Sequence, residues 1–347
     1  MPLCTGRDLP APGRFVRTQL GDESVIVVRG RDRVLRAFLN VCRHRGSRLC
    51  RADSGDVGRA IRCPYHAWAY QLDGRLIATP NWQSTGTIDK AGYSLHPVHL
   101  AEWHGLVWLN LAADPEPLAG QLWSQLDHRL GGDRAKFARY GVADLVLGRR
   151  VSYDVAANWK IIQENFQECY HCGTIHPELV DTVPAFGRLA GGSTAGYDTG
   201  GYLFADGKAS FSVTGTARLP RIPGLEAGDD RKYYGMILRP NCAISLLPDH
   251  VIVHRFEMVS PDTTRMVCEW LFPSQTIAAG YDIDDTVELF HRVNAQDFTA
   301  SEGCQPNMRS RAYRDGGVLV PAEQEVIGRW YYRWYRAAMG LPEQPFK

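Results

Sequence analysis

Two short loops, at residues 40–46 and 63–70, each combine one cysteine with one histidine. The first loop contains Cys42 and His44, and the second contains Cys63 and His66. This combination suits a [2Fe-2S] cluster in which two thiolates bind one iron and two imidazoles bind the other. In such a cluster each loop must give one ligand to each iron. A structural zinc site is the alternative, but zinc sequences usually group like ligands in separate knuckles. The pattern therefore predicts a histidine-ligated [2Fe-2S] cluster.

Both loops closely resemble the cluster-binding loops of Rieske oxygenases. The resemblance rests on residues 40–46, on residues 63–70, and on the Leu-Asp-Gly sequence at 72–74 that follows. The segment between His44 and Cys63 is slightly longer than in the family. We expect it to bulge between the loops and to leave the ligands untouched.

The composition is that of an ordinary globular protein with room for two domains: 347 residues, 44% hydrophobic and 22% charged. A net charge of +1 gives no reason to expect nucleic acid or an acidic membrane surface as a partner. No apolar run approaches the ~18 to 20 residues of a membrane helix, and the N-terminus lacks the layout of a signal peptide. We therefore expect a soluble, cytoplasmic protein, where a reducing environment keeps its cysteines as free thiols.

Short apolar runs separated by turn residues predict an all-β domain between residues 24 and 111. The runs lie at 25–28, 34–38, 60–62 and 106–109. The sequence Asp-Pro-Glu-Pro at 114–117 indicates a linker, because two prolines interrupt both helix and sheet. We expect a first domain at 1–115 and a second at 116–347.

The second part of the chain mixes strands and helices. Residues 250–259 and 264–272 flank the turn at 260–262 and predict a β-hairpin. Residues 281–299 and 322–339 carry helical periodicity.

A second set of polar residues lies in the segment 158–178. Glu164, Glu168 and His171 are spaced to share one face of a helix. On an uninterrupted helix, His176 would lie on a different face from His171. We therefore expect Gly173 and Pro177 to end the helix, so that the chain can bring His176 back beside His171. Two imidazoles with one carboxylate form the facial arrangement of non-haem Fe(II) oxygenases. Taken alone, the segment also fits a solvated, charged helix face.

The cluster motif followed by Glu-x-x-His-x4-His resembles the catalytic α subunit of Rieske non-haem iron oxygenases over nearly the whole chain. The resemblance implies an α+β fold, with a Rieske [2Fe-2S] β-sandwich domain joined to a helix-grip (Bet v 1-like) catalytic domain that has a curved antiparallel sheet. It implies a mononuclear Fe(II) held by His171, His176 and Asp297. Competing carboxylates fit helix caps or surface charge instead; they are Asp282, Asp284, Asp285 and Glu302.

The resemblance also implies an oligomer. Glu168 matches the family's bridging carboxylate, which connects the iron ligand His171 to a cluster histidine, expected to be His66, of the neighbouring subunit. A head-to-tail homotrimer brings the two metal sites together in this way. Arginines near the cluster suit either docking of an acidic electron donor or pairing at the subunit interface; they are Arg43, Arg45, Arg48 and Arg62.

The activity implied is hydroxylation of a C–H bond of a small molecule with O₂ and electrons from NAD(P)H, which reach the cluster through a flavin or iron-sulfur reductase or a ferredoxin. Most relatives have Asp at the bridging position. Glu168 here resembles the branch that acts on quaternary amines such as glycine betaine, proline betaine and carnitine, where hydroxylation of an N-methyl carbon gives an unstable hemiaminal that loses formaldehyde.

A quaternary ammonium would be held by aromatic faces. The available aromatic residues, which also fit a plain core, are Phe166, Tyr170, Phe186, Tyr197, Phe204, Phe211, Tyr234 and Trp270. An aromatic-ring or natural-product hydroxylase or dioxygenase is the alternative within the family. An electron-transfer Rieske protein without catalysis is the alternative of another class, and the presence of all three iron ligands argues against it. The sequence leaves open the substrate, the reductase, a β subunit, and an N-terminal helical segment that relatives usually carry.

Overall fold

The computed structural model describes residues 2–82, 86, 88–127, 129–187, 200–314, 316–318 and 326–342, with the side chains of 2–5 and 326–330 excepted. The aromatic candidate Tyr197 and residues 322–325 of the expected last helix lie outside this set. The chain divides into two compact units, Met1–Gln121 and Leu122–Lys347. This division falls a few residues after the expected boundary at 115.

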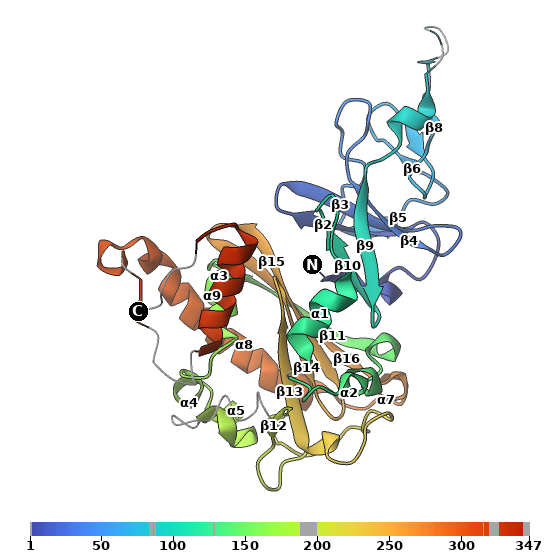
Figure 1. The fold of residues 1–347 in the computed structure, drawn as a ribbon. Coiled ribbons are helices and arrows are strands. Elements are labelled where there is room, and N and C mark those ends of the chain that lie inside the picture. The colour runs from blue at the N-terminus through green and yellow to red at the C-terminus, as the bar shows by residue number, and fades with distance from the viewer. Residues whose placement is uncertain are drawn as a thin grey trace. The chain divides into compact units, whose positions relative to one another are not determined.

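The first unit contains a seven-stranded antiparallel sheet with the order β1-β10-β9-β4-β3-β2-β5, and a three-stranded sheet β6-β7-β8 (Figure 1). The strands of the larger sheet are β1 (Pro2–Thr5), β2 (Arg14–Leu20), β3 (Glu23–Arg29), β4 (Leu35–Leu39), β5 (Ser54–Asp56), β9 (Pro97–Trp103) and β10 (Leu106–Asn110). Those of the smaller sheet are β6 (Ile61–Arg62), β7 (Ala69–Tyr70) and β8 (Leu76–Ala78).

The apolar run in β3 explains why this strand is central. Successive side chains of a strand point to opposite faces of the sheet. Ile26 and Val28 enter one hydrophobic cluster, and Val25 and Val27 enter another on the other side. A strand that is buried on both faces has a continuous run of apolar residues, as β3 does. The strands of the two sheets confirm the expected all-β first domain.

The second unit is built on a six-stranded antiparallel sheet with the order β11-β16-β15-β14-β13-β12. Its strands are β11 (Val146–Val155), β12 (Tyr202–Leu203), β13 (Lys232–Leu238), β14 (Cys242–Leu246), β15 (Val251–Ser260) and β16 (Thr263–Phe272). Helix α1 (Leu118–Leu126) crosses the division between the units. The described helices within the second unit are α2 (Arg134–Arg139), α3 (Trp159–Asn165), α4 (Cys172–Ile175), α5 (Pro177–Thr182), α7 (Ser274–Ala278), α8 (Asp284–Cys304) and α9 (Val326–Ala338). The predicted hairpin is confirmed as β15 and β16, and the helix expected at 281–299 as α8.

Helix α8 lies against the curved sheet, as Figure 1 shows. Val287, Phe290 and Val293 pack with Trp270 of β16, and Phe298 packs with Phe256 of β15. Buried positions recur along α8 at intervals of three or four residues, which is the period of one helix face. Asp297 lies on this buried face, so a carboxylate stands where the pattern calls for an apolar side chain.

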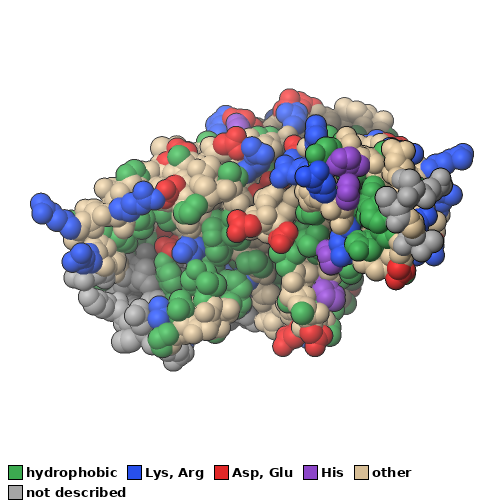
Figure 2. All heavy atoms as spheres, turned by 90° about the horizontal axis from the view of Figure 1, so that it is seen from above, with side chains coloured by type: hydrophobic (Ala, Val, Ile, Leu, Met, Phe, Trp, Pro, Cys, Tyr) green, Lys and Arg blue, Asp and Glu red, His purple; other side chains and the backbone are tan. Residues whose placement is uncertain are grey.

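Both acidic and basic side chains occur on the face of the molecule seen in Figure 2. Among the helices that the structure describes, none has the length and apolar character needed to cross a membrane.

Candidate metal centres and their pocket

The two Cys/His loops of the first unit bring their ligands together. The His44 and His66 rings lie 4.7 Å apart, and the Trp68 ring stacks on His44 at 4.8 Å. Each loop closes on a backbone hydrogen bond to its cysteine carbonyl, from Gly46 to Cys42 and from Ala67 to Cys63. The loops are therefore held by their own turns and by a stacked indole ring.

The side-chain atoms of these loops fit a histidine-ligated [2Fe-2S] cluster. Cys42 and Cys63 are buried, and the buried Nδ1 atoms of His44 and His66 have no hydrogen-bond partner among the described residues. Buried polar atoms normally have partners, so two orphaned nitrogens beside two thiols indicate ligands. The Tyr70 hydroxyl lies 3.3 Å from Cys42 Sγ.

The environments of the two thiols differ. Burial raises the pKa of Cys42. Burial also acts to raise the pKa of Cys63, but backbone N–H groups of Tyr65 and His66 outweigh it and lower that pKa. A lowered thiol pKa favours the thiolate, which is the form that binds iron.

The helix expected to carry Glu164, Glu168 and His171 on one face is shorter than predicted. Helix α3 ends at Asn165, and Glu168 and His171 lie in the turns that follow. The prediction of a shared helical face was therefore wrong. The chain leaves the helix just after Phe166, whose backbone is still helical and whose ring packs against His254, Phe256 and Phe298.

The expected helix terminators also act differently. Gly173 lies inside the short helix α4, and Pro177 is the first residue of α5, a position where proline is favoured because its missing N–H is not needed. His176 is the residue between these helices. The chain does bring His176 beside His171, with ring centroids 5.2 Å apart, but through two short helices rather than through one helix end.

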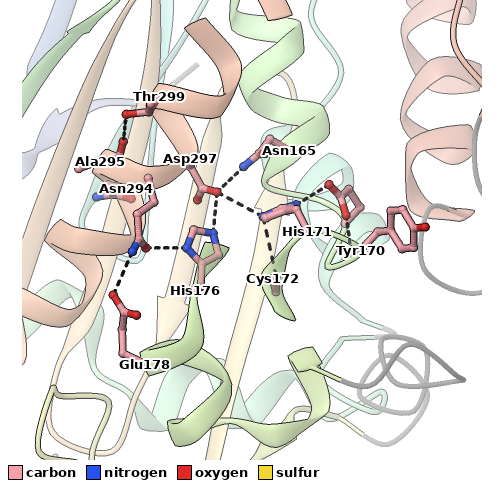
Figure 3. A network of polar contacts seen from close by, with 12 residues as sticks. Asn165, Tyr170, His171, Cys172, His176, Glu178, Asn294, Ala295, Asp297 and Thr299 are labelled. Carbon is pink, nitrogen blue, oxygen red and sulfur yellow. Dashed lines mark hydrogen bonds and ion pairs between the residues drawn. The ribbon is translucent and has the colours of Figure 1, made fainter. Parts of the chain in front are cut away.

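His171, His176 and Asp297 meet at one point, and each offers an atom within 4.8 Å of the others (Figure 3). Asp297 Oδ1 lies 2.8 Å from His176 Nε2 and 3.2 Å from His171 Nε2. Asn165 donates to the same carboxylate oxygen at 2.6 Å. Although burial acts to raise the pKa of Asp297, hydrogen bonds with the two histidines lower it. Two imidazoles and one ionised carboxylate could hold a divalent iron.

The competing carboxylates lie elsewhere. Asp284 pairs with Arg149 at 2.7 Å, and Asp285 accepts hydrogen bonds from Thr214. Asp282 accepts from the backbone N–H of Asp284, and Glu302 accepts from that of Ala156. Each has the capping or surface role that was the alternative to metal binding.

In both His171 and His176, the Nδ1 atom has a hydrogen-bond partner. Glu168 Oε1 lies 2.5 Å from His171 Nδ1. Burial opposes protonation of His171, but hydrogen bonds with Asp297 and Glu168 outweigh it and raise its pKa to about 10. Gln296 Oε1 lies 2.7 Å from His176 Nδ1, and Gln296 Nε2 donates to Glu178 at 3.2 Å.

Several of these supporting residues were missed by sequence reasoning. Gln296 directly precedes Asp297 in the sequence, and Glu178 lies two positions after His176. This proximity to predicted ligands was the signal that could have identified them. Glu164 takes no part in the histidine cluster, because it accepts a hydrogen bond from Tyr332 of α9.

The three-residue cluster opens into a pocket of about 110 Å³. Among the described residues, six aromatic side chains line it: Phe166, Phe186, Tyr202, Phe211, Tyr233 and Phe290. Phe166, Phe186 and Phe211 were among the aromatic candidates, whereas Tyr202, Tyr233 and Phe290 were missed. Of the other described candidates, Tyr170 is exposed and Phe204, Tyr234 and Trp270 are buried outside the pocket lining.

His254 is a further pocket residue that the sequence did not single out. It is buried against the rings of Phe166 and Phe290, and its Nε2 lies 3.1 Å from Asn294 Oδ1. Burial lowers its pKa to about 4. His254 is therefore a neutral imidazole at physiological pH.

Comparison with known proteins matches both halves of the chain. Residues 1–91 match the Rieske [2Fe-2S] domain, and residues 142–341 match the ring-hydroxylating α subunit catalytic domain. The carnitine monooxygenase oxygenase subunit of Escherichia coli is 32% identical over 315 residues, covering 88% of this chain and 77% of that protein. The glycine betaine monooxygenase oxygenase subunit of Pseudomonas aeruginosa is 28% identical, covering 96% of this chain and 81% of that protein.

The chain is also similar to a solved structure of a Rieske monooxygenase. The quaternary ammonium Rieske monooxygenase CntA in complex with L-carnitine superimposes with a TM-score of 0.66 and 26% identity, covering 90% of this chain and 80% of that one.

Proposed function

Since the chain belongs to the Rieske non-haem iron oxygenases, we propose that it removes an N-methyl group from a betaine-like quaternary ammonium compound by oxidation. Members of this family are oxidoreductases that incorporate oxygen from O₂, with a [2Fe-2S] cluster in one domain and a mononuclear iron in the other. We assign residues 1–115 to the cluster and residues 116–347 to catalysis.

One observation carries the substrate proposal: the candidate iron ligands face a pocket lined by six aromatic rings. Ring faces attract a quaternary ammonium, which cannot donate hydrogen bonds. The sequence similarity to enzymes named for glycine betaine and carnitine supports the same substrate class.

In this proposal the [2Fe-2S] cluster is held by Cys42, His44, Cys63 and His66, and the mononuclear iron by His171, His176 and Asp297. When bound, the iron supplies the O₂-reducing chemistry of the family, and the cluster delivers the electrons.

One oxygen atom of O₂ enters an N-methyl C–H bond, and the other is reduced to water with two electrons and two protons. The N-hydroxymethyl product then loses formaldehyde and one proton and leaves a tertiary amine.

The protein residues orient the metal ligands and exclude water. Glu168 and Gln296 accept hydrogen bonds from Nδ1 of His171 and His176, so both rings present Nε2 toward Asp297. Fixing the tautomer through the far nitrogen raises ligand basicity and prevents ring rotation. The aromatic walls then keep the reacting methyl group in an apolar space.

As an oxygenase subunit, the chain needs an electron-transfer partner. We propose a flavin or iron-sulfur reductase or a ferredoxin that draws on NAD(P)H. We further propose a homotrimer in which Glu168 connects His171 to the cluster of the neighbouring subunit. Glu168 contacts His171 through Oε1 and accepts from the backbone N–H of Tyr170 through Oε2, and its side chain is 18% exposed, so part of this carboxylate lies at the surface for such a contact.

The test is turnover with a reductase across a panel of betaines and aromatic compounds. Formaldehyde should form in proportion to NAD(P)H oxidised with at least one betaine. His171→Ala, His176→Ala and Asp297→Ala should lose the mononuclear iron and the turnover while keeping the cluster's EPR signal, and Thr299→Val on the exposed side of α8 should keep both. Only hydrogen peroxide with every betaine, together with coupled hydroxylation of an aromatic compound, would reassign the enzyme to ring hydroxylation.

A further inference from the structure

Two cysteines flank the candidate iron ligand His171. Cys169 and Cys172 are the two cysteines that lie closest together in the sequence, in the spacing Cys-x-x-Cys, and both are free thiols in the structure. Both side chains line the catalytic pocket. Neither belongs to the cluster ligands or to the candidate iron ligands, so the two metal sites leave this pair without a role.

A tight turn brings the two cysteines close in space. The backbone N–H of Cys172 donates to the carbonyl oxygen of Cys169 at 3.3 Å. A turn of this kind places its first and last Cα atoms within about 7 Å of each other, and a disulfide spans about 4.4 to 6.8 Å between Cα atoms. The side chains interact as well, because a hydrogen bond with the Cys169 thiol raises the pKa of Cys172, and burial adds to the rise. The backbone therefore has the span that a disulfide between these residues needs.

The same turn carries part of the candidate iron site. Tyr170 and His171 are its central residues, and Cys172 Sγ lies 3.8 Å from His171 Nε2, the atom proposed to bind iron (Figure 3). The backbone N–H of Tyr170 donates to Glu168, which contacts the other ring nitrogen of His171. A disulfide would draw the Cys172 sulfur toward Cys169, so the turn and the imidazole that it carries would shift.

We propose that Cys169 and Cys172 are a redox-sensitive pair, which hydrogen peroxide converts to a disulfide that weakens iron binding at His171. The oxidant comes from the oxygenase chemistry of the family, because O₂ that takes up two electrons and two protons without hydroxylating a substrate leaves as hydrogen peroxide. Peroxide released in this way enters the space that both thiols line. The inference needs only the oxygenase activity and is independent of the identity of the substrate.

The oxidation has two steps. Cys169 is the expected first target, since its side chain is partly exposed whereas that of Cys172 is 3% exposed. The Cys169 sulfur takes one oxygen atom as the O–O bond breaks, which gives a sulfenic acid and one water. The Cys172 thiol then attacks this sulfur, the S–O bond breaks, and a second water leaves. The two sulfurs together lose two electrons, which the peroxide gains, and a reducing thiol restores both cysteines.

The first measurement identifies the disulfide. Reduced holoenzyme is treated with hydrogen peroxide, free thiols are alkylated, and the tryptic peptide 161–188, which contains both cysteines, is analysed by mass spectrometry. The wild-type peptide should escape alkylation and lose two hydrogen atoms, and a phosphine reductant should reverse both changes. Cys169→Ala should form no disulfide. Cys304→Ser is the matched control, because Cys304 is exposed and outside the pocket lining, and this variant should form the same disulfide as wild type.

The second measurement is the affinity for Fe(II), determined by competition with a chelator, with the cluster absorbance as the internal measure of intact protein. The disulfide forms of wild type and Cys304→Ser should hold the mononuclear iron roughly 10- to 100-fold more weakly than the reduced proteins, the range for a disturbed support of a metal ligand. Reduction should restore the affinity. The iron affinity of Cys169→Ala should not respond to peroxide.

A peptide that keeps both thiols at peroxide concentrations that oxidise Cys304 would overturn the proposal. A disulfide that leaves the Fe(II) affinity unchanged would do the same, as would an equal loss of affinity in Cys169→Ala. None of these results bears on N-demethylation, which is tested separately by formaldehyde release.

Discussion

Gln296 should control the affinity of the protein for its mononuclear iron although it is not a ligand. Its side chain lies between His176 and Glu178, accepting from His176 Nδ1 at 2.7 Å and donating to Glu178 at 3.2 Å. Gln296→Leu keeps a side chain of similar size and removes both hydrogen bonds. The substitution therefore tests the hydrogen bond and not the packing.

The expected magnitude follows from the burial of His176, which is 1% exposed. Without Gln296, water cannot easily replace the lost acceptor, and an unsatisfied buried donor costs about 1 to 3 kcal/mol. At 1.4 kcal/mol for each factor of ten, this corresponds to roughly a 5- to 150-fold change in an equilibrium constant. The effect of removing a metal ligand's supporting partner is typically about 10- to 100-fold in metal affinity, which agrees.

The assay is competition for Fe(II) between the protein and a chelator, with the cluster absorbance as the internal measure of intact protein. Gln296→Leu should release its mononuclear iron at a lower chelator concentration, by roughly 10- to 100-fold in affinity. Thr299→Val, an exposed position on the same helix, should behave as wild type. Unchanged iron affinity in Gln296→Leu, while His176→Ala loses the metal, would show that Gln296 does not support this ligand.

Three further outcomes are expected. Protein purified with iron available should be brown and give a rhombic EPR signal on reduction, and Cys63→Ser should lose both; a colourless, zinc-loaded wild type would contradict the cluster assignment. Glu168→Gln should keep both metals but fail to reoxidise its reduced cluster in a single turnover with substrate and O₂, whereas normal reoxidation would limit Glu168 to a structural role. His254 has a folded-state pKa of about 4, below the unfolded value of 6.5, so only the unfolded chain gains a proton on it between these pH values. Wild type should therefore lose up to about 3 kcal/mol of stability relative to His254→Gln as the pH falls from 6.5 to 4, as measured by denaturation, and parallel pH profiles would refute this.

Features that depend on short stretches of chain could be predicted from the sequence. Each cluster loop holds its cysteine and histidine within four residues, and backbone hydrogen bonds inside each loop bring them together. The hairpin of β15 and β16 follows from two apolar runs flanking one turn. Local geometry and alternation of apolar residues are sufficient in these cases, because few other arrangements would satisfy them.

The path of the chain between Glu164 and His176 depended on tertiary packing. Helical periodicity placed Glu164, Glu168 and His171 on one face, but α3 ends at Asn165, where the Phe166 ring packs against β15 and α8. The free energy gained by burying an aromatic side chain is larger than the preference of a few residues for helix.

The sequence by itself determined the chemistry of this protein, since the identity and spacing of its cysteines, histidines and carboxylates specify which metals it can bind. Only the tertiary structure decided which side chains surround those groups. His176 and Asp297 meet across 121 residues of sequence, and Arg129 reaches the same pocket from the end of α1. Such contacts form because the sheet and α8 bury their apolar faces together, and the polar residues on those faces then meet partners that no local pattern encodes.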